Sequence, residues 1–180
     1  MNSPIIKKFL VPAAFLILCF ITYGLLIPWL GFYWDDWPYQ FFARTLGPSG
    51  FWQVFEHDRP FLSLTYSTFV PLFGPHPMVW QVFGSLTRWL TVLSLWWLLN
   101  LTWPDNRRQN TWAAALFAVY PGFTQQWISV IYSQAHLLLA SFILSMAGMV
   151  YAYRKPRAFW PATALSLLAS TLSLFSTEYF

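Results

Sequence analysis

Two adjacent carboxylates, Asp35 and Asp36, lie between tryptophans directly after a long apolar segment. Successive residues of a helix point about 100° apart, so these side chains cannot share one proton-transfer role. Asp36 is suited to cap a short helix beginning at Trp37-Pro38, because a carboxylate is favoured at the amide end and proline in the first turn. Asp35 then lies beside apolar surface, where desolvation suits a carboxylate to general-base work. We therefore predict that Asp35 and Asp36 are both catalytic-site residues, and that one can act as a helix cap while the other reacts.

A run of ionisable residues, Glu56-His57-Asp58-Arg59, follows in the same segment. Runs of charged residues commonly form solvent-exposed turns. Here Pro60-Phe61 and further apolar residues follow at once. This places Arg59 at a membrane interface, where a guanidinium can hold a phosphate through two parallel hydrogen bonds. The predicted substrate-binding residues of this run are Arg59, His57 and Asp58.

The composition places the chain in a lipid bilayer. Hydrophobic residues make up 57% of its 180 residues and charged residues only 9%, whereas soluble domains have about 25% charged residues. Aromatic residues reach 22%, which is typical of chains with much surface at the lipid headgroups. The net charge of +4 comes from Lys and Arg scattered at the ends of apolar segments, a pattern that sets membrane orientation, so we exclude nucleic acid as a partner. The single cysteine, Cys19, supports neither a disulfide framework nor a thiolate metal site.

Apolar segments of spanning length alternate with short polar breaks. The first follows Lys7-Lys8 and lacks a cleavage site, so it is a retained span and not a signal peptide. The apolar stretch 112–153 is too long for one span and is broken at Pro121-Gly122, so we divide it into a hairpin of two spans. We predict an all-α integral membrane protein with a single membrane domain, 1–180, and about five spans at 9–30, 78–101, 112–127, 135–153 and 159–177.

The segment 31–77 mixes apolar and polar residues and contains turn signals at Gly47-Pro48 and Gly74-Pro75. A membrane span would not tolerate these. Its aromatic pieces 39–46 and 51–56 are short and amphipathic, so we predict helices that lie in the membrane interface.

Positive charge predicts the orientation. Lys7-Lys8, Arg107-Arg108 and the cluster at 154–157 fall on one side of the predicted spans, which the positive-inside rule assigns to the cytoplasm. The Asp35-Asp36 loop then faces the outer side, periplasmic or extracellular. Glu178, at the end of the last span, falls on that side too and is a further predicted substrate-binding residue.

Arg88 lies within the second predicted span, where a charged side chain is costly and often functional. Snorkelling toward the outer headgroups is the alternative. We retain Arg88 as a predicted substrate-binding residue. His136 is expected to satisfy a hydrogen bond between helices. Hydrogen bonds to a sugar could come from Gln125, Gln126, Tyr132 and Gln134.

Metal chemistry is weakly indicated. The sequence has no His-x-x-His or Glu-x-x-His pair, and two aspartates alone make a poor site. We predict no protein metal site and no required cofactor, although a divalent cation could bind carboxylates together with a substrate phosphate.

The order of these features resembles the GT-C superfamily of polytopic membrane glycosyltransferases, in particular its protein O-mannosyltransferase and lipid A aminoarabinose transferase branch. The resemblance rests on a first outward-running span, interfacial helices, and the motifs Trp34-Asp35-Asp36-Trp37 and Arg59-Pro60-Phe61. It covers most of the chain by layout and two short motifs by residue. Family members usually have more spans, so we expect the chain to be an amino-terminal part of such an enzyme.

The resemblance implies transfer of a sugar from a polyprenyl-phosphate donor to an acceptor on the outer face of the cell-envelope membrane. It implies that Asp35 activates the acceptor, that Asp36 has a variable supporting role, and that Arg59 binds the lipid phosphate. The alternative is a non-catalytic membrane protein, a transporter half or an assembly partner, in which Arg88 and His136 would line a pathway. The first and fifth predicted spans are almost wholly apolar, which favours chemistry at the membrane surface.

Overall fold

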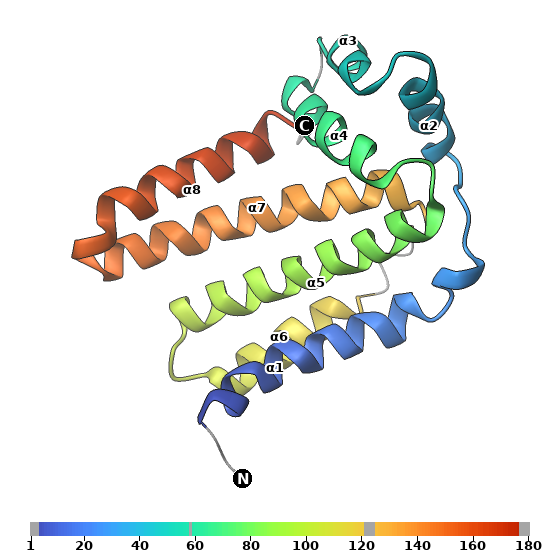
Figure 1. Cartoon of the computed structure of the whole chain (residues 1–180). Helices are drawn as coiled ribbons and strands as arrows, with labels where there is room; N and C mark the ends of the chain where they lie inside the picture. Colours follow the sequence, from blue (N-terminus) through green and yellow to red (C-terminus); the bar gives the residue numbers. More distant parts are fainter. Residues whose placement is uncertain (1–3, 58, 121–124, 177–180) are drawn as a thin grey trace.

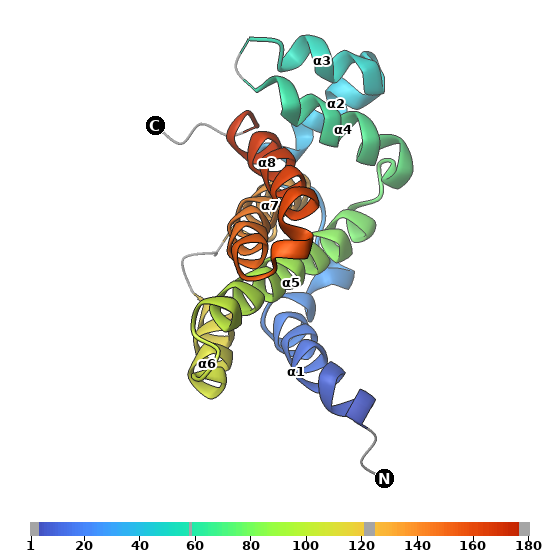
Figure 2. The same cartoon turned by 90° about the vertical axis from the view of Figure 1, so that its left-hand side faces the viewer.

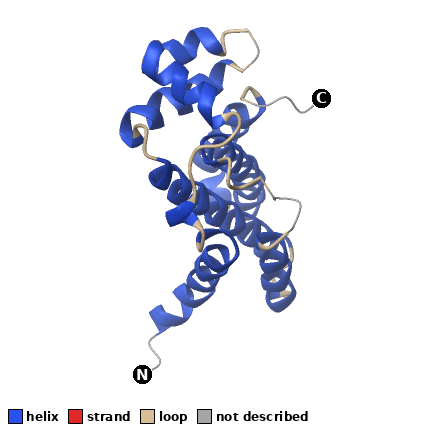
Figure 3. Ribbon diagram, turned by 90° about the vertical axis from the view of Figure 1, so that its right-hand side faces the viewer, coloured by secondary structure: helices blue, strands red, loops and turns tan. Residues whose placement is uncertain are grey.

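The computed structural model describes residues 4–57, 59–120 and 125–176, and every regular element in these ranges is a helix (Figure 3). This confirms the predicted all-α class. The α-helices are α1 (Pro4–Cys19), α2 (Asp36–Thr45), α3 (Phe51–Val54), α4 (Pro60–Phe73), α5 (Pro77–Thr102), α6 (Arg107–Ala118), α7 (Ser129–Arg154) and α8 (Phe159–Leu174). A π-helical turn, Phe20–Gly24, extends α1, and short 3-10 turns join several of the others.

In the described part of the chain, three helical segments are long and apolar enough to cross a membrane: Phe9–Trp29, Pro77–Thr102 and Ser129–Arg154. They correspond to the first, second and fourth predicted spans. The other two predicted spans overlap α6, with 12 residues, and α8, with 16. At 1.5 Å per residue these helices are about 18 and 24 Å long, against about 30 Å for the hydrocarbon core. The count of five spans therefore stays a prediction.

The long helices lie in successive layers (Figures 1 and 2). α8 lies along α7 and α7 along α5, while α1 and α6 pack on the far side of α5. α2, α3 and α4 lie together at one end of the layers (Figure 1). The turns that join α5 to α6 and α7 to α8, which carry the basic clusters at 107–108 and 154–157, lie at the opposite end (Figure 1).

Proline and glycine set the ends of α4, the helix that the sequence analysis did not predict. Pro60 occupies its first turn, where the missing amide hydrogen costs nothing. α4 accommodates Pro71 near its end and stops at Gly74, whose φ of 56° is a left-handed conformation open to glycine. The predicted interfacial helices correspond to α2 and α3.

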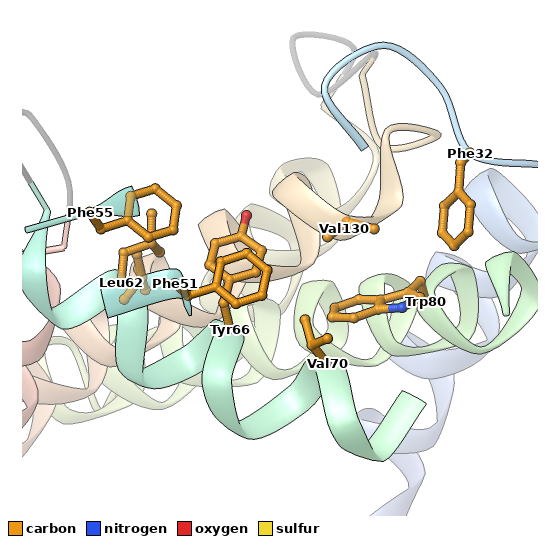
Figure 4. Close-up of a cluster of buried hydrophobic side chains, with 9 residues drawn as sticks. Phe32, Phe51, Phe55, Leu62, Tyr66, Val70, Trp80 and Val130 are labelled. Atoms are coloured by element: carbon orange, nitrogen blue, oxygen red, sulfur yellow. The ribbon is translucent and has the colours of Figure 1, made fainter. Parts of the chain in front are cut away.

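An aromatic stack holds α2, α3 and α4 together, and Figure 4 shows three of its rings, those of Phe51, Phe55 and Tyr66. The Tyr66 ring lies 4.9 Å from that of Tyr39, with the two planes 11° apart, and 5.2 and 5.4 Å from the rings of Phe51 and Phe55. Aromatic pairs at these separations contribute about 0.5–1.5 kcal/mol each beyond the burial of their area. The buried cluster extends to α5 and α7 and consists of Phe32, Phe51, Phe55, Leu62, Tyr66, Val70, Trp80, Val130 and Leu138.

Candidate functional site

A cavity of about 240 Å³ lies where α2, α4, α7 and the end of α8 meet. The residues of α7 that line it are spaced three and four apart, so they occupy one face of the helix. Both predicted motifs reach this cavity, because Asp35 and Arg59 line it together. Its full lining is Asp35, Tyr39, Arg59, Leu62, Tyr66, Ile131, Gln134, Ala135, Leu138 and Ser176.

Asp36 does not line this cavity and instead caps α7. Its Oδ2 atom accepts hydrogen bonds from the Ser129 amide at 2.9 Å and the Ser129 hydroxyl at 3.3 Å. Its Oδ1 atom accepts from the amides of Val130 at 2.9 Å and Ile131 at 3.4 Å. These are the first three amides of α7, which have no acceptor within their own helix. Asp36 thus caps a helix distant in sequence, where the sequence analysis expected it to cap its own.

The turn at Trp34, directly before the two carboxylates, contains backbone strain. Trp34 has a φ of 44°, the left-handed region that bulky residues rarely adopt. The amides of Asp36 and Trp37 close the turn by donating to Tyr33 and Trp34. The Trp34 ring packs edge-on against Trp127, 6.0 Å away. This geometry directs Asp36 inward and leaves Asp35 exposed at the cavity, with no hydrogen bond to any described residue.

Burial raises the pKa of Asp36 to about 6, against the lowering effect of the amides that it accepts from. The folded protein therefore binds this proton more tightly than the unfolded chain does. Stability that depends on the proton is fully present below about pH 4 and is lost as the pH rises through 6.

We expect the wild-type protein to gain about 2 kcal/mol relative to Asp36→Asn when the pH falls from 7.5 to 4.5. Thermal unfolding of both proteins across this range measures the effect, and because they share every other titrating group, the difference isolates Asp36. Parallel curves would contradict the prediction.

Arg59 enters the cavity from the start of α4. It is the residue that precedes Pro60, and its carbonyl accepts from the amide of Leu62 at 2.9 Å. Its amide donates to Phe55 at 3.2 Å, which ties the residue back to α3. Arg59 is thus fixed at both backbone groups, and the amide end of α4 adds positive potential beside its guanidinium.

Tyr39 and Tyr66 line the same cavity as Asp35 and Arg59. Burial raises the pKa of Tyr66 well above its usual value, and the neighbouring Tyr39, Asp36 and Asp35 raise it further, while Arg59 lowers it. The Tyr66 phenol is therefore protonated at neutral pH and can donate a hydrogen bond.

The structure places the other predicted site residues elsewhere. His57 is exposed and does not line the cavity. Arg88 is buried among protein groups: it donates to the Ala118 carbonyl at 3.2 Å and to Gln126 Oε1 at 3.1 Å, and lies 3.5 Å from the Tyr23 ring centroid. It therefore neither snorkels nor reaches the cavity. The predictions for Asp58 and Glu178 lie outside the described residues.

Of the other predicted polar groups, His136 is buried and its carbonyl accepts from the Thr91 hydroxyl at 2.9 Å, a bond between α5 and α7. The Tyr132 hydroxyl donates to Gln125. Among the four residues considered for sugar contacts, Gln134 lines the cavity.

The candidate cavity is not the one that volume alone would select. A cavity of about 670 Å³ lies between α5, α7 and α8, but its lining contains no ionisable side chain. Within the described ranges, no three His, Cys, Asp or Glu side chains gather where they could hold a metal ion. A divalent cation held by a carboxylate and a substrate phosphate stays a prediction. The combination of a carboxylate, a guanidinium and phenols makes the smaller cavity the candidate site.

The sequence analysis missed Tyr39, Tyr66 and Ser176, which line the cavity from three separate elements. Asp35 lies four residues before Tyr39, about one turn along the helix that begins next to it, and this spacing is the signal that could have found Tyr39. Comparisons with protein-family models, with curated proteins and with solved structures give no match to this chain.

Proposed function

We propose that this chain carries the catalytic end of a membrane glycosyltransferase, which moves a sugar from a polyprenyl-phosphate donor to the hydroxyl of an acceptor. One observation supports this above the others: Asp35 and Arg59, separated in sequence by all of α2 and α3, line the same cavity. Sugar transfer needs a base for the acceptor and positive charge for the departing phosphate. The two residues supply these groups.

The reaction is a single displacement. The acceptor oxygen forms a bond to the anomeric carbon as the bond from that carbon to the phosphate oxygen breaks. The acceptor proton passes to the Asp35 carboxylate, and the electron pair of the broken bond stays on the polyprenyl phosphate. Because the phosphate is already a good leaving group, no acid is needed, and attack opposite the leaving group inverts the anomeric centre.

Arg59 is suited to hold the donor phosphate. A guanidinium binds phosphate oxygens through two parallel hydrogen bonds, which Lys cannot do. The residue lies at the amide end of α4, a helix of 14 residues, and such an end itself favours an anion. The phosphate would therefore meet two sources of positive potential at one point.

The proposed site faces the outer side of the membrane. The exposed basic segments at 107–108 and 154–157 lie at the end of the layers away from α2 and α4 (Figure 1), and positive loops favour the cytoplasm. Exposed Trp37 and Trp52 on α2 and α3 suit the headgroup region. A polyprenyl tail in the hydrocarbon core could then present its phosphate to Arg59.

The test is transfer of radiolabel from a polyprenyl-phosphate hexose in membranes from cells that produce the protein, compared with membranes that lack it. We expect Arg59→Gln to weaken apparent donor affinity about 10- to 100-fold, the effect of losing charge-assisted hydrogen bonds. Arg44→Gln is the matched control, because Arg44 is exposed on α2 and does not line the cavity; its effect should stay within about twofold.

The proposal would be contradicted if, with every hexose tested, the label stayed on the donor in membranes that contain the protein as well as in membranes that lack it. Equal losses from Arg59→Gln and Arg44→Gln would also contradict it, because a general charge effect at the membrane surface would then explain both.

A further inference from the structure

Gln134 is a buried polar side chain on the α7 face that lines the candidate cavity. It is 1% exposed, and neither its Nε2 nor its Oε1 atom has a hydrogen-bond partner among the described residues. Nearly all buried polar side chains in folded proteins are hydrogen-bonded, so such an amide calls for an explanation. A ligand that enters the cavity would supply both partners.

Ser176, which follows α8, repeats the pattern. It is 0% exposed, it lines the same cavity, and its hydroxyl also lacks a partner within the described residues. Two buried polar groups without a described partner, one on α7 and one after α8, thus belong to residues that line the cavity with Asp35 and Arg59.

Gln81 is a buried glutamine whose amide nitrogen, unlike that of Gln134, is satisfied by protein groups. Gln81 on α5 is 2% exposed, and its amide donates to the carbonyls of Trp127 at 2.8 Å and Gly31 at 3.4 Å. Gln81 and Gln134 therefore have similar burial and different hydrogen bonding. Gln81 provides a matched control for experiments on Gln134.

The chemistry of a carboxamide defines the ligand. It offers one acceptor and two donors, all uncharged, so a phosphate, which only accepts, would leave Oε1 unsatisfied. Neighbouring hydroxyls of a sugar both donate and accept, and match the amide and the Ser176 hydroxyl. We propose that Gln134, with Ser176, binds the sugar hydroxyls of the donor and makes binding depend on the sugar. This inference rests on the proposed function, which places the donor in this cavity.

The first test needs no ligand. In the purified protein, Gln134→Met should raise the melting temperature by about 2–4 °C, because an unsatisfied buried amide is replaced by an apolar chain of similar length. Gln81→Met should lower the melting temperature, because it removes a bonded amide. A fall for Gln134→Met similar to that for Gln81→Met would overturn the inference, since Gln134 would then have a structural role.

The second test compares polyprenyl phosphate with polyprenyl-phosphate glucose, mannose and galactose as thermal-shift ligands. At least one sugar lipid should bind the wild-type protein about tenfold more tightly than the bare lipid. Gln134→Met should abolish this preference and Ser176→Ala reduce it, with binding of the bare lipid unchanged. A preference that survives both substitutions, or no preference with any of the three sugars, would overturn the inference and leave water as the partner of these groups.

Binding and transfer separate the two proposals. Sugar-dependent binding through Gln134 without any transfer would remove the proposed function and keep the inference. Sugar transfer whose sugar preference does not depend on Gln134 would support the proposed function and overturn the inference.

Discussion

Replacing Asp35 with asparagine should lower the rate of sugar transfer by about 10²- to 10⁴-fold, the usual contribution of a general base. Asparagine keeps the shape of the side chain and cannot accept the acceptor proton. The folded protein should be unaffected, within about 0.5 kcal/mol, because Asp35 is exposed and makes no hydrogen bond to a described residue. Initial rates at saturating donor, together with thermal unfolding, measure both effects.

Asp105→Asn is the matched control, since Asp105 is exposed between α5 and α6 at the other end of the layers (Figure 1). It should change neither rate nor stability. Donor binding by Asp35→Asn should also persist, because we propose that Arg59, and not Asp35, holds the phosphate. A rate for Asp35→Asn within a factor of two of the wild type would remove Asp35 as the base.

Replacing Asp36 with alanine should cost about 2–3 kcal/mol of stability at pH 7, the second large effect that we expect. The three amides at the start of α7 would lose their acceptor in a buried place. α2 would also lose its hydrogen bonds to α7, so the cavity between them should open. Thermal unfolding measures the loss, and faster hydrogen exchange at residues 129–131 would locate it.

The neighbouring aspartate provides the comparison for this experiment. Asp35→Ala removes the same group from an adjacent position and should leave both unfolding and exchange at 129–131 nearly unchanged. Asp36→Asn should fall between wild type and Asp36→Ala, because its remaining oxygen can still accept a hydrogen bond. Equal destabilisation by the two alanine substitutions would show that the α7 cap is not what Asp36 contributes.

Local features of the sequence predicted much of the fold. Apolar length identified the three segments that can cross a membrane. The aromatic, amphipathic pieces 39–46 and 51–56 predicted α2, Asp36–Thr45, and α3, Phe51–Val54. These helices were predictable because amphipathicity and turn residues act over a few positions. The chemistry of Arg59 and Asp35 also selected two residues that share a cavity.

Contacts between distant segments could not be predicted in this way. No local pattern shows that Asp36 meets the amides of residues 129–131, because a single sequence carries no signal for pairing across such a distance. α4 escaped prediction because its residues mix apolar and polar types between the turn signals at Gly47-Pro48 and Gly74-Pro75, whereas the aromatic stack around Tyr66 supports the helix. Gln134 was only one of several polar groups until the structure showed that it lines the cavity and that its amide has no partner among the described residues.

The bond between Asp36 and Ser129 joins residues 93 positions apart, which bears on how the protein is made. A ribosome adds about 5–20 residues per second, so the carboxylate emerges on the order of 5–20 s before its partner amides. Throughout that interval the Asp36 carboxylate lacks these amides as partners. The nascent chain therefore acquires its pocket only once α7 has been inserted, and any product released earlier lacks the site.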